Sequence, residues 1–296
     1  MHSTPTHPRS ERPNRSTARF SSRLALALLI SVAMHGVAAA KRIAIGASQT
    51  AILVWIAQER GYFRDQGLDV EIRLFQSGLR AADAVIHGHA DLSTTSETAF
   101  VSRSFDRPDL RILATISASE TSRLIARGDR AINAPRDLAG KRIGVTLGSI
   151  SEYFLTRYLT LNGIQAATTA MIDLTPEDIA EQLAKGDIDA GLTWEPFVRN
   201  AELALKSNLI TLPQQFDQIY YFTLVSTQNW IDENQADARA ILRAIIQAET
   251  YTAEHPFAAK ELFRKRFDMS AEYIDHLWPL HNLHVSLPQG LLFVLE

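Results

Sequence analysis

Two stretches of the chain repeat one pattern of apolar and polar positions about a hundred residues apart. In each copy, a short apolar run leads through a loop of small polar residues into an apolar segment that a glycine closes. The first copy covers residues 43–61 and the second covers residues 143–163. This pattern predicts a buried strand, a loop and a helix in each copy. The loops hold Ser48, Gln49 and Thr50 in the first copy and Gly148, Ser149 and Ser151 in the second.

A second pair of matching segments follows at nearly the same offset. Residues 88–91 and residues 186–189 each lead through a short apolar stretch into a polar loop and a helix start. The residues of these two loops are Thr95, Ser96 and Glu97 in one copy and Trp194 and Glu195 in the other. Open α/β sheets bind ligands at the carboxyl ends of their strands. We therefore expect the four loops to border a cleft between two α/β lobes.

The rest of the chain predicts strands and helices in alternation. Residues 68–74 alternate between apolar and polar, as in a half-buried strand. Thr175 and Pro176 form a strong helix start, and the chain is almost all helical from residue 229 onward. This order predicts mainly parallel sheets with helices on both faces. We expect the chain to cross between the lobes near residues 115–121 and again near residues 220–226.

The first 40 residues predict a secretory signal. Five arginines precede an apolar stretch, residues 24–40, that ends in three alanines. A membrane anchor is the alternative, but this stretch has only 17 residues and contains His35 and Gly36. Cleavage after Ala40 leaves 256 residues and changes the formal net charge from −3 to −7, because five Arg and one Glu are lost. We expect an exported protein in a bacterial periplasm.

Composition and motifs exclude several classes of protein. The chain has no cysteine, which excludes disulfides, thiolate metal sites and thiol nucleophiles. An acidic chain without a basic stripe is a poor partner for nucleic acid. The common hydrolase, metalloprotease and dinucleotide-binding motifs are missing from the sequence. His281 and His284 have the spacing of a helical metal pair but no adjacent carboxylate, so we expect neither a metal nor a cofactor.

The loop residues allow a ligand-binding and a structural interpretation. Hydroxyl groups and backbone N–H groups at helix N-termini bind anions, and each hydrogen bond to a charged group contributes roughly 1.5–3 kcal/mol. A single loop of this kind would more simply hold ordinary N-caps, but the duplication favours a ligand. Trp194 is either an apolar wall of the cleft or a core residue. Glu97 and Glu195 either accept from a ligand amine or act as acids in the first turn of a helix.

The order of these motifs resembles the solute-binding proteins of ABC importers. The likeness is to the nitrate, sulfonate and taurine group, which includes relatives of the thiamine-pyrimidine synthases. It covers most of residues 41–230. The segments that carry it are Gly61-Tyr62-Phe63, Gly67-Leu68-Asp69-Val70, residues 91–98, residues 137–145, Gly148-Ser149 and residues 189–197.

The resemblance implies a type II periplasmic-binding-protein fold, with two α/β lobes, a ligand cleft between them and two crossover strands. Lobe I would comprise residues 41–117 and 222–296, and lobe II residues 118–221, after a signal peptide of residues 1–40. Members usually continue through further helix, so the end at residue 296 implies a truncated chain or a short last helix. The implied ligand-binding residues are Ser48, Gln49, Thr50, Thr95, Ser96, Glu97, Gly148, Ser149, Ser151, Trp194 and Glu195.

The expected function is that of the periplasmic substrate-binding component of an ABC importer. It would capture a small polar organic anion or zwitterion, similar to a sulfonate or taurine, by hinge closure and deliver it to the permease and its ATPase. The four loops contain no Arg or Lys, which favours neutralisation by hydroxyl and N–H groups, while Glu97 and Glu195 disfavour bare nitrate. The alternatives are a thiamine-pyrimidine-synthase-like enzyme, whose activity is associated with a cysteine motif, and a periplasmic sensor. We expect a monomer.

Overall fold

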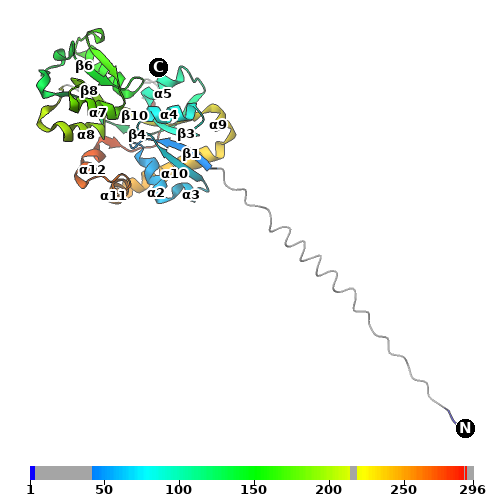
Figure 1. Ribbon diagram of the computed structural model, residues 1–296. Helices are drawn as coiled ribbons and strands as arrows, with labels where there is room; N and C mark the ends of the chain where they lie inside the picture. Colours follow the sequence, from blue (N-terminus) through cyan, green and yellow to red (C-terminus); the bar gives the residue numbers. More distant parts are fainter. Residues whose placement is uncertain (4–41, 214–218, 290, 292–296) are drawn as a thin grey trace. The chain divides into compact units, whose positions relative to one another are not determined.

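The computed structural model describes residues 1–3, 42–213, 219–289 and 291. Residues 1–40 and 41–296 are separate units, and the second unit contains the fold (Figure 1). The predicted signal peptide lies outside the described residues except for its first three, and so do residues 292–296 of the predicted last helix. Across the described ranges, none of the helices has the length and apolar character that a membrane crossing requires.

The strands form two mixed sheets in the described part of the chain. One has six strands in the order β11-β4-β10-β3-β1-β2, and the other has five in the order β7-β6-β8-β5-β9. The bounds are β1 Arg42–Ala47, β2 Asp69–Leu74, β3 Leu92–Ser96, β4 Leu110–Ser119, β5 Ser122–Arg127, β6 Arg142–Val145, β7 Ala170–Asp173, β8 Ala190–Trp194, β9 Leu209–Thr211, β10 Tyr220–Thr227 and β11 His281–Asn282.

The sheets are mixed, whereas the sequence predicted mainly parallel ones. Strands β2-β1-β3 and strands β7-β6-β8 are parallel, as expected for strand-helix-strand units. Strands β4, β5 and β10 pair antiparallel with their neighbours. The reason is that β5 and β10 run against β8 and β3 of the repeated units, while β4 runs against β10 and so has the same direction as β3.

The helices agree with the sequence pattern to within a few residues. Trp55 on α2 packs edge-on against Phe267, which follows α11, with ring centroids 5.3 Å apart. The bounds are α2 Ile52–Arg60, α3 Tyr62–Asp65, α4 Gly78–Ile86, α5 Glu97–Ser104, α6 Ile150–Leu161, α7 Pro176–Lys185, α8 Phe197–Leu205, α9 Gln228–Glu233, α10 Gln235–Glu254, α11 Pro256–Arg266 and α12 Ala271–Leu277.

The repeated pattern corresponds to two copies of one unit, β1-α2-β2-α4-β3 and β6-α6-β7-α7-β8. Ile45 pairs with Leu92 in the first copy, and Ile143 pairs with Ala190 in the second. Ile45 is therefore the counterpart of Ile143, at an offset of 98 residues. The internal repeat, as read from the sequence, aligned Ile43 with Ile143. This alignment is two residues out of register, because both residues begin similar apolar runs.

Asp91 and Asp189, which end the matching segments 88–91 and 186–189, hold the strands of each copy together. The carboxylate of Asp91 accepts from the N–H of Ala44 at 2.8 Å, and that of Asp189 accepts from the N–H of Arg142 at 2.9 Å. The backbone N–H of each aspartate in turn donates to the carbonyl of the same partner. Each aspartate thus joins the start of its third strand to the middle strand of the unit.

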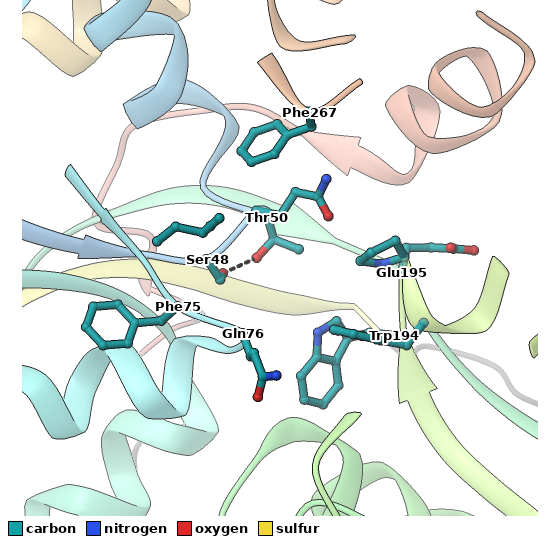
Figure 2. A pocket seen from close by; sticks show the side chains of 11 residues that line it. Ser48, Thr50, Phe75, Gln76, Trp194, Glu195 and Phe267 are labelled. Carbon is teal, nitrogen blue, oxygen red and sulfur yellow. Dashed lines mark hydrogen bonds between the residues drawn. The ribbon is translucent and has the colours of Figure 1, made fainter. Parts of the chain in front are cut away.

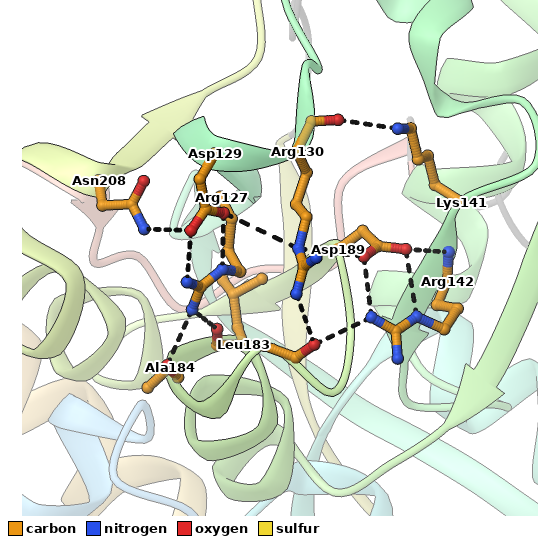
Figure 3. Close-up of polar contacts among 10 residues, drawn as sticks. Arg127, Asp129, Arg130, Lys141, Arg142, Leu183, Ala184, Asp189 and Asn208 are labelled. Atoms are coloured by element: carbon orange, nitrogen blue, oxygen red, sulfur yellow. Dashed lines mark hydrogen bonds and ion pairs between the residues drawn. The ribbon is translucent and has the colours of Figure 1, made fainter.

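Three arginines near Asp189 cap the C-terminal end of α7. Figure 3 shows Arg127, Arg130 and Arg142 donating to carbonyls of the last helical residues and of Gly186, at 2.8–2.9 Å. The last carbonyls of a helix lack intrahelical partners and carry the negative end of its dipole. The guanidinium groups satisfy both needs. Hydrogen bonds and charge from Arg142 hold the pKa of Asp189 below its usual value.

The chain changes sheets twice, and the two crossings meet. Strand β4 ends at Ser119 and β5 begins at Ser122, while β10 returns the chain to the first sheet from Tyr220. The hydroxyl oxygens of Thr121 and Tyr220 lie 2.8 Å apart, which joins the two connections. Figure 1 shows β6, β8, α7 and α8 grouped in one part and β1, β3, α4 and α10 in another. The lobe boundaries at residues 117/118 and 221/222 stay predictions.

We expect Asp189→Ala to lower the free energy of unfolding by about 2 kcal/mol, because the N–H of Arg142 loses its acceptor and the side chains of Arg130 and Arg142 lose a counter-charge. Urea unfolding of the purified chain measures this. Asp187→Ala is the control, since Asp187 is exposed two positions away. Equal stability of the two variants would contradict the role of Asp189.

Candidate functional site

Hydroxyl-bearing residues from both sheets surround a small enclosed cavity, which we call the inner chamber. Its volume is about 20 Å³. The helix starts of α4, α5 and α6 contribute Ser77, Ser96 and Ser149, and β10 contributes Tyr220. The full lining is Thr50, Ser77, Gly78, Leu79, Ser96, Ala99, Ser149, Ile150, Trp194, Tyr220 and Phe222.

Each of the three serines is the N-cap of its helix. The hydroxyl oxygens of Ser77, Ser96 and Ser149 accept from backbone N–H groups of the first turn, each at 3.2 Å. The hydroxyl of Ser149 also donates to the carbonyl of Thr146 at 2.6 Å. Three helix N-termini therefore converge on one cavity, and the positive ends of their dipoles favour an anion there. Gly78 allows this approach, because a Cβ at that position would lie 2.8 Å from the Cα of Thr95.

A larger cavity, the outer chamber, adjoins the inner one through Thr50 and Trp194. Its volume is about 330 Å³, and its walls combine four aromatic residues with polar ones (Figure 2). Trp194 packs edge-on against Phe197, with ring centroids 6.3 Å apart. The lining residues are Ser48, Gln49, Thr50, Leu74, Phe75, Gln76, Trp194, Glu195, Pro196, Phe197 and Phe267.

Seven of the predicted site residues border one of these chambers. Ser48, Gln49 and Glu195 line the outer one, Ser96 and Ser149 line the inner one, and Thr50 and Trp194 line both. Trp194 unites the two interpretations of the sequence, because it is only 7 % exposed and also forms a wall of the cavities.

The other four predicted residues lie behind the chamber walls. Ser151 is fully buried, and its hydroxyl lies 2.9 Å from that of Ser149 and accepts from the N–H of Thr146. Thr95 is fully buried in β3, and its carbonyl accepts from Thr223. Gly148 has a left-handed φ of 73°, and its N–H donates to Glu152. Glu97 is the fourth of these residues.

Glu97 is a buried acid at the start of α5. Its side chain is 3 % exposed, and its Oε2 has no hydrogen-bond partner among the described residues. Burial raises the pKa of Glu97 to about 8, because a low-dielectric surrounding disfavours the carboxylate. The group is therefore mostly uncharged at neutral pH and adds little negative charge beside the inner chamber.

Glu195 borders the outer chamber, but its carboxylate points elsewhere. Figure 2 shows the side chain extending away from Thr50 and Trp194. The carboxylate accepts from the hydroxyl of Tyr273 at 2.9 Å and from the N–H of Arg199 at 3.3 Å. Glu195 precedes the N-cap Pro196, so it is not an acid in the first turn of α8, although its carboxylate accepts from an N–H of that turn. Burial raises the pKa of Glu195.

Neither chamber is lined by an Arg, Lys or His of the described residues. This agrees with the lack of cationic residues in the four sequence loops. An anion in the inner chamber would be held by hydroxyl groups and helix N-termini alone.

Several lining residues were missed by the sequence analysis. Ser77 stands directly before α4, and a serine before an apolar periodic segment is a helix-start signal that could have identified it. Phe75 and Gln76 directly follow the predicted strand at residues 68–74. They therefore lie at the carboxyl end of a strand, as the residues of the four predicted loops do. Phe267 carries no such signal, because it reaches the cavity from the end of α11, far away in the sequence.

The histidine pair at the C-terminal end is not on a helix, which corrects the spacing argument. His281 lies in β11 opposite Ser119 and is buried, with Nδ1 2.8 Å from the hydroxyl of Ser119. His284 contacts the carboxylate of Glu249 instead. Extended backbone turns the two rings to different partners. Within the described ranges, no group of three or more potential ligands is placed to hold a metal ion.

Comparison with known families gives a match over most of the chain. The sequence model of the family described as NMT1/THI5 like matches residues 49–259. The chain belongs to the NMT1/THI5-like family. The match includes every predicted ligand-binding residue except Ser48.

Two relatives of this NMT1/THI5-like protein are named as binding proteins. One from Brucella abortus (strain 2308) is 24 % identical over 71 % of this chain. The match spans 66 % of that relative's length, just under two thirds. One from Bacillus subtilis (strain 168), named for binding aliphatic sulfonates, is 24 % identical over 80 % of this chain and 73 % of its own length.

A solved structure confirms the predicted fold of this family member. The alkanesulfonate-binding protein from Xanthomonas axonopodis pv. citri, bound to MOPS, is similar with a TM-score of 0.77. The superposition covers 86 % of this chain and 89 % of that one at 15 % identity. The NMT1/THI5-like chain therefore has the periplasmic-binding-protein fold, with two α/β lobes.

We expect Glu97→Gln to flatten the pH dependence of stability. The pKa of Glu97 is raised, so its contribution to the free energy of unfolding is complete below about pH 4.5 and disappears as the pH rises to about 8. The loss over that interval is on the order of 5 kcal/mol, since each pKa unit corresponds to about 1.4 kcal/mol. Urea unfolding from pH 4.5 to 8.5 measures it. Parallel curves for the variant and the parent would contradict this prediction.

We expect Tyr273→Phe to lower the free energy of unfolding by about 1–3 kcal/mol, because the buried carboxylate of Glu195 loses its hydroxyl donor. In a double-mutant cycle, the same change in a Glu195→Gln background should have a smaller effect, since an amide is less costly to bury than a carboxylate. Equal effects in the two backgrounds would show that the hydrogen bond contributes nothing.

Proposed function

We propose that this protein is the substrate-binding component of an ABC importer, and that it binds a small organic anion or zwitterion in the inner and outer chambers. The ligand class proposed is that of sulfonates, with taurine-like zwitterions included. Binding would take place in the periplasm, after removal of residues 1–40, by a monomer. Delivery would be to a membrane permease driven by its ATPase.

The observation that carries this proposal is the convergence of three helix N-termini on the inner chamber. Hydrogen bonds from neutral donors to an ionised acceptor are shorter and stronger than those between neutral groups. At roughly 1.5–3 kcal/mol each, two or three such bonds suffice to select an anion without a cationic side chain. A sulfonate offers three oxygens, which suits donors that approach from several directions.

Polar contacts between residues of the two predicted lobes support binding by closure. Gln76, which follows β2, donates to Glu177 on α7 at 2.7 Å. On another side, Arg199 on α8 lies 3.4 Å from Glu272 on α12. These contacts join the two predicted lobes on both sides of the outer chamber. A ligand that contacts both lobes would favour the arrangement that forms them, by a shift of population toward the closed form.

A role in solute binding fits the two relatives described above, which are named as binding proteins. The enzyme alternative has less support, because the chain has no cysteine and the chambers hold no evident nucleophile and base pair among the described residues. No contact of the described residues favours a sensor over an importer component.

We expect Ser96→Ala and Ser149→Ala each to weaken ligand binding about 10-fold or more, because a donor or its supporting cap is lost at the anion. Isothermal titration with alkanesulfonates, taurine, nitrate and pyrimidines identifies the ligand and gives the affinities. Trp194→Ala should also weaken binding, because Trp194 borders both chambers.

The control separates loss of a helix cap from loss of a ligand contact. Thr227 caps α9 in the same way, through a hydrogen bond to the N–H of Trp230, and it lines neither chamber. Thr227→Ala should cost about 1 kcal/mol of stability, like the serine variants, with no change in affinity. Unchanged affinity in Ser96→Ala, Ser149→Ala and Trp194→Ala together would refute the site.

A further inference from the structure

We infer that Glu97 links ligand binding to a proton: the inner chamber accepts an anion while the carboxyl of Glu97 is protonated, and ionisation of Glu97 releases the anion. The inference rests on the proposed function, since it takes an anion to be held in the inner chamber, and it adds a regulation of that site by pH. The juxtaposition that carries it is a buried, unpaired acid directly behind a chamber that no cationic side chain of the described residues lines.

Glu97 stands where α5 meets the inner chamber. Ser96, the residue before it, is the N-cap of α5 and lines the chamber, and Ala99 in the first turn lines it as well. Glu97 lies between them along the chain and is only 3 % exposed. Consecutive Cα atoms are about 3.8 Å apart, so the acid is one residue away from a proposed contact of the anion.

The carboxyl group of Glu97 is buried without a counter-charge. Its Oε2 has no hydrogen-bond partner among the described residues. Backbone N–H groups of Glu97, Thr98 and Tyr221 favour the ionised form, but burial outweighs them and raises the pKa of Glu97 to about 8. The group therefore changes its charge just above neutral pH.

The two helices that pack against α5 leave this carboxyl unpaired. On α4, Asp83 accepts from Arg103 of α5 at 2.6 Å and lies 3.8 Å from Arg80. On α6, Glu152 accepts a backbone N–H of the preceding loop at 2.7 Å. Among the described residues, none of the charged side chains on these helices contributes to the pKa of Glu97.

The neighbouring strands add one titratable side chain that is coupled to Glu97. Strand β3 carries no ionisable residue. On β10, burial and, to a smaller extent, the charge of Glu97 raise the pKa of Tyr220 to about 12. Tyr220 lines the inner chamber and stays neutral over the range in which Glu97 titrates. Glu97 is therefore the group beside the chamber whose charge changes near pH 8.

A bound anion and an ionised Glu97 would exclude each other. Like charges a few ångströms apart repel strongly where water is excluded. An ionised Glu97 would also cancel the positive end of the α5 dipole that favours the anion. The neutral carboxyl does neither. By reciprocity the bound anion favours the protonated form, so that binding above the pKa of Glu97 takes up a proton.

Calorimetric titration of the full protein against pH tests the inference. Methanesulfonate is the probe, because it stays an anion over the whole pH range. We expect its affinity to be level from pH 6 to 7 and to fall about tenfold between pH 7 and 9, as Glu97 ionises. Comparison of two sulfonate-free buffers with different ionisation enthalpies should show nearly one proton taken up per ligand at about pH 9. An affinity independent of pH, or binding without proton uptake, overturns the inference.

Substitutions locate the proton. Glu97→Gln and Glu97→Met remove the charge at similar length, so the affinity should change by less than about twofold over the same interval. Glu195→Gln is the matched control, because Glu195 is also 3 % exposed and borders the outer chamber, but its carboxylate is bound to Tyr273. This variant should keep the tenfold fall. A fall that persists in the Glu97 variants, or that disappears in Glu195→Gln, assigns the proton to another group.

The outcomes separate this inference from the proposed function. If methanesulfonate binds with an affinity that does not depend on the charge of Glu97, the proposed function stands and the inference fails. If none of the anions binds at any pH tested, the anion site itself is wrong and both fail. If Glu97→Gln does not fold, Glu97→Met decides the question, since apolar residues replace buried charged ones readily.

Discussion

Both halves of the molecule depend on one hydrogen-bonding arrangement, in which an aspartate carboxylate accepts the backbone N–H of the middle strand. Asp91 and Asp189 make this bond at equivalent positions and thereby fix where the third strand begins. The strand register in turn determines where each strand ends and each helix starts. Because three of those helix starts reach one cavity, the position of the inner chamber follows from a contact at the other end of the strands.

Much of this arrangement could be predicted from the sequence, because the repeat places a strand end, a loop and a helix start in a recognisable order. Ser96, Ser149 and Trp194 were predicted to border a cleft, and they border the chambers. The register of the repeat was misjudged by two residues, since Ile43 and Ile45 offer the same apolar signal. Only the pairing of Ile45 with Leu92 distinguishes them.

Other features could not be predicted, because they depend on contacts between distant segments. Phe267 enters the outer chamber only because α11 packs against α2, and no local pattern encodes that packing. The direction of the Glu195 carboxylate depends on Tyr273, which lies 78 residues further along the chain. The mixed character of the sheets is similar, since it arises from strands that pass between the two sheets.

The two copies differ at the residue before their first helix. Ser149 caps α6 with its hydroxyl, whereas the equivalent position before α2 is Ala51, which has no side chain able to do so. The first turn of α2 therefore begins without a side-chain acceptor, beside the loop of Ser48 and Thr50 that borders the outer chamber. The helix starts that reach the inner chamber are instead those of α4, α5 and α6, each of which has a serine N-cap. The two copies therefore share one fold but differ in chemistry, since the first helix of one copy places a capping hydroxyl at the inner chamber and that of the other copy does not.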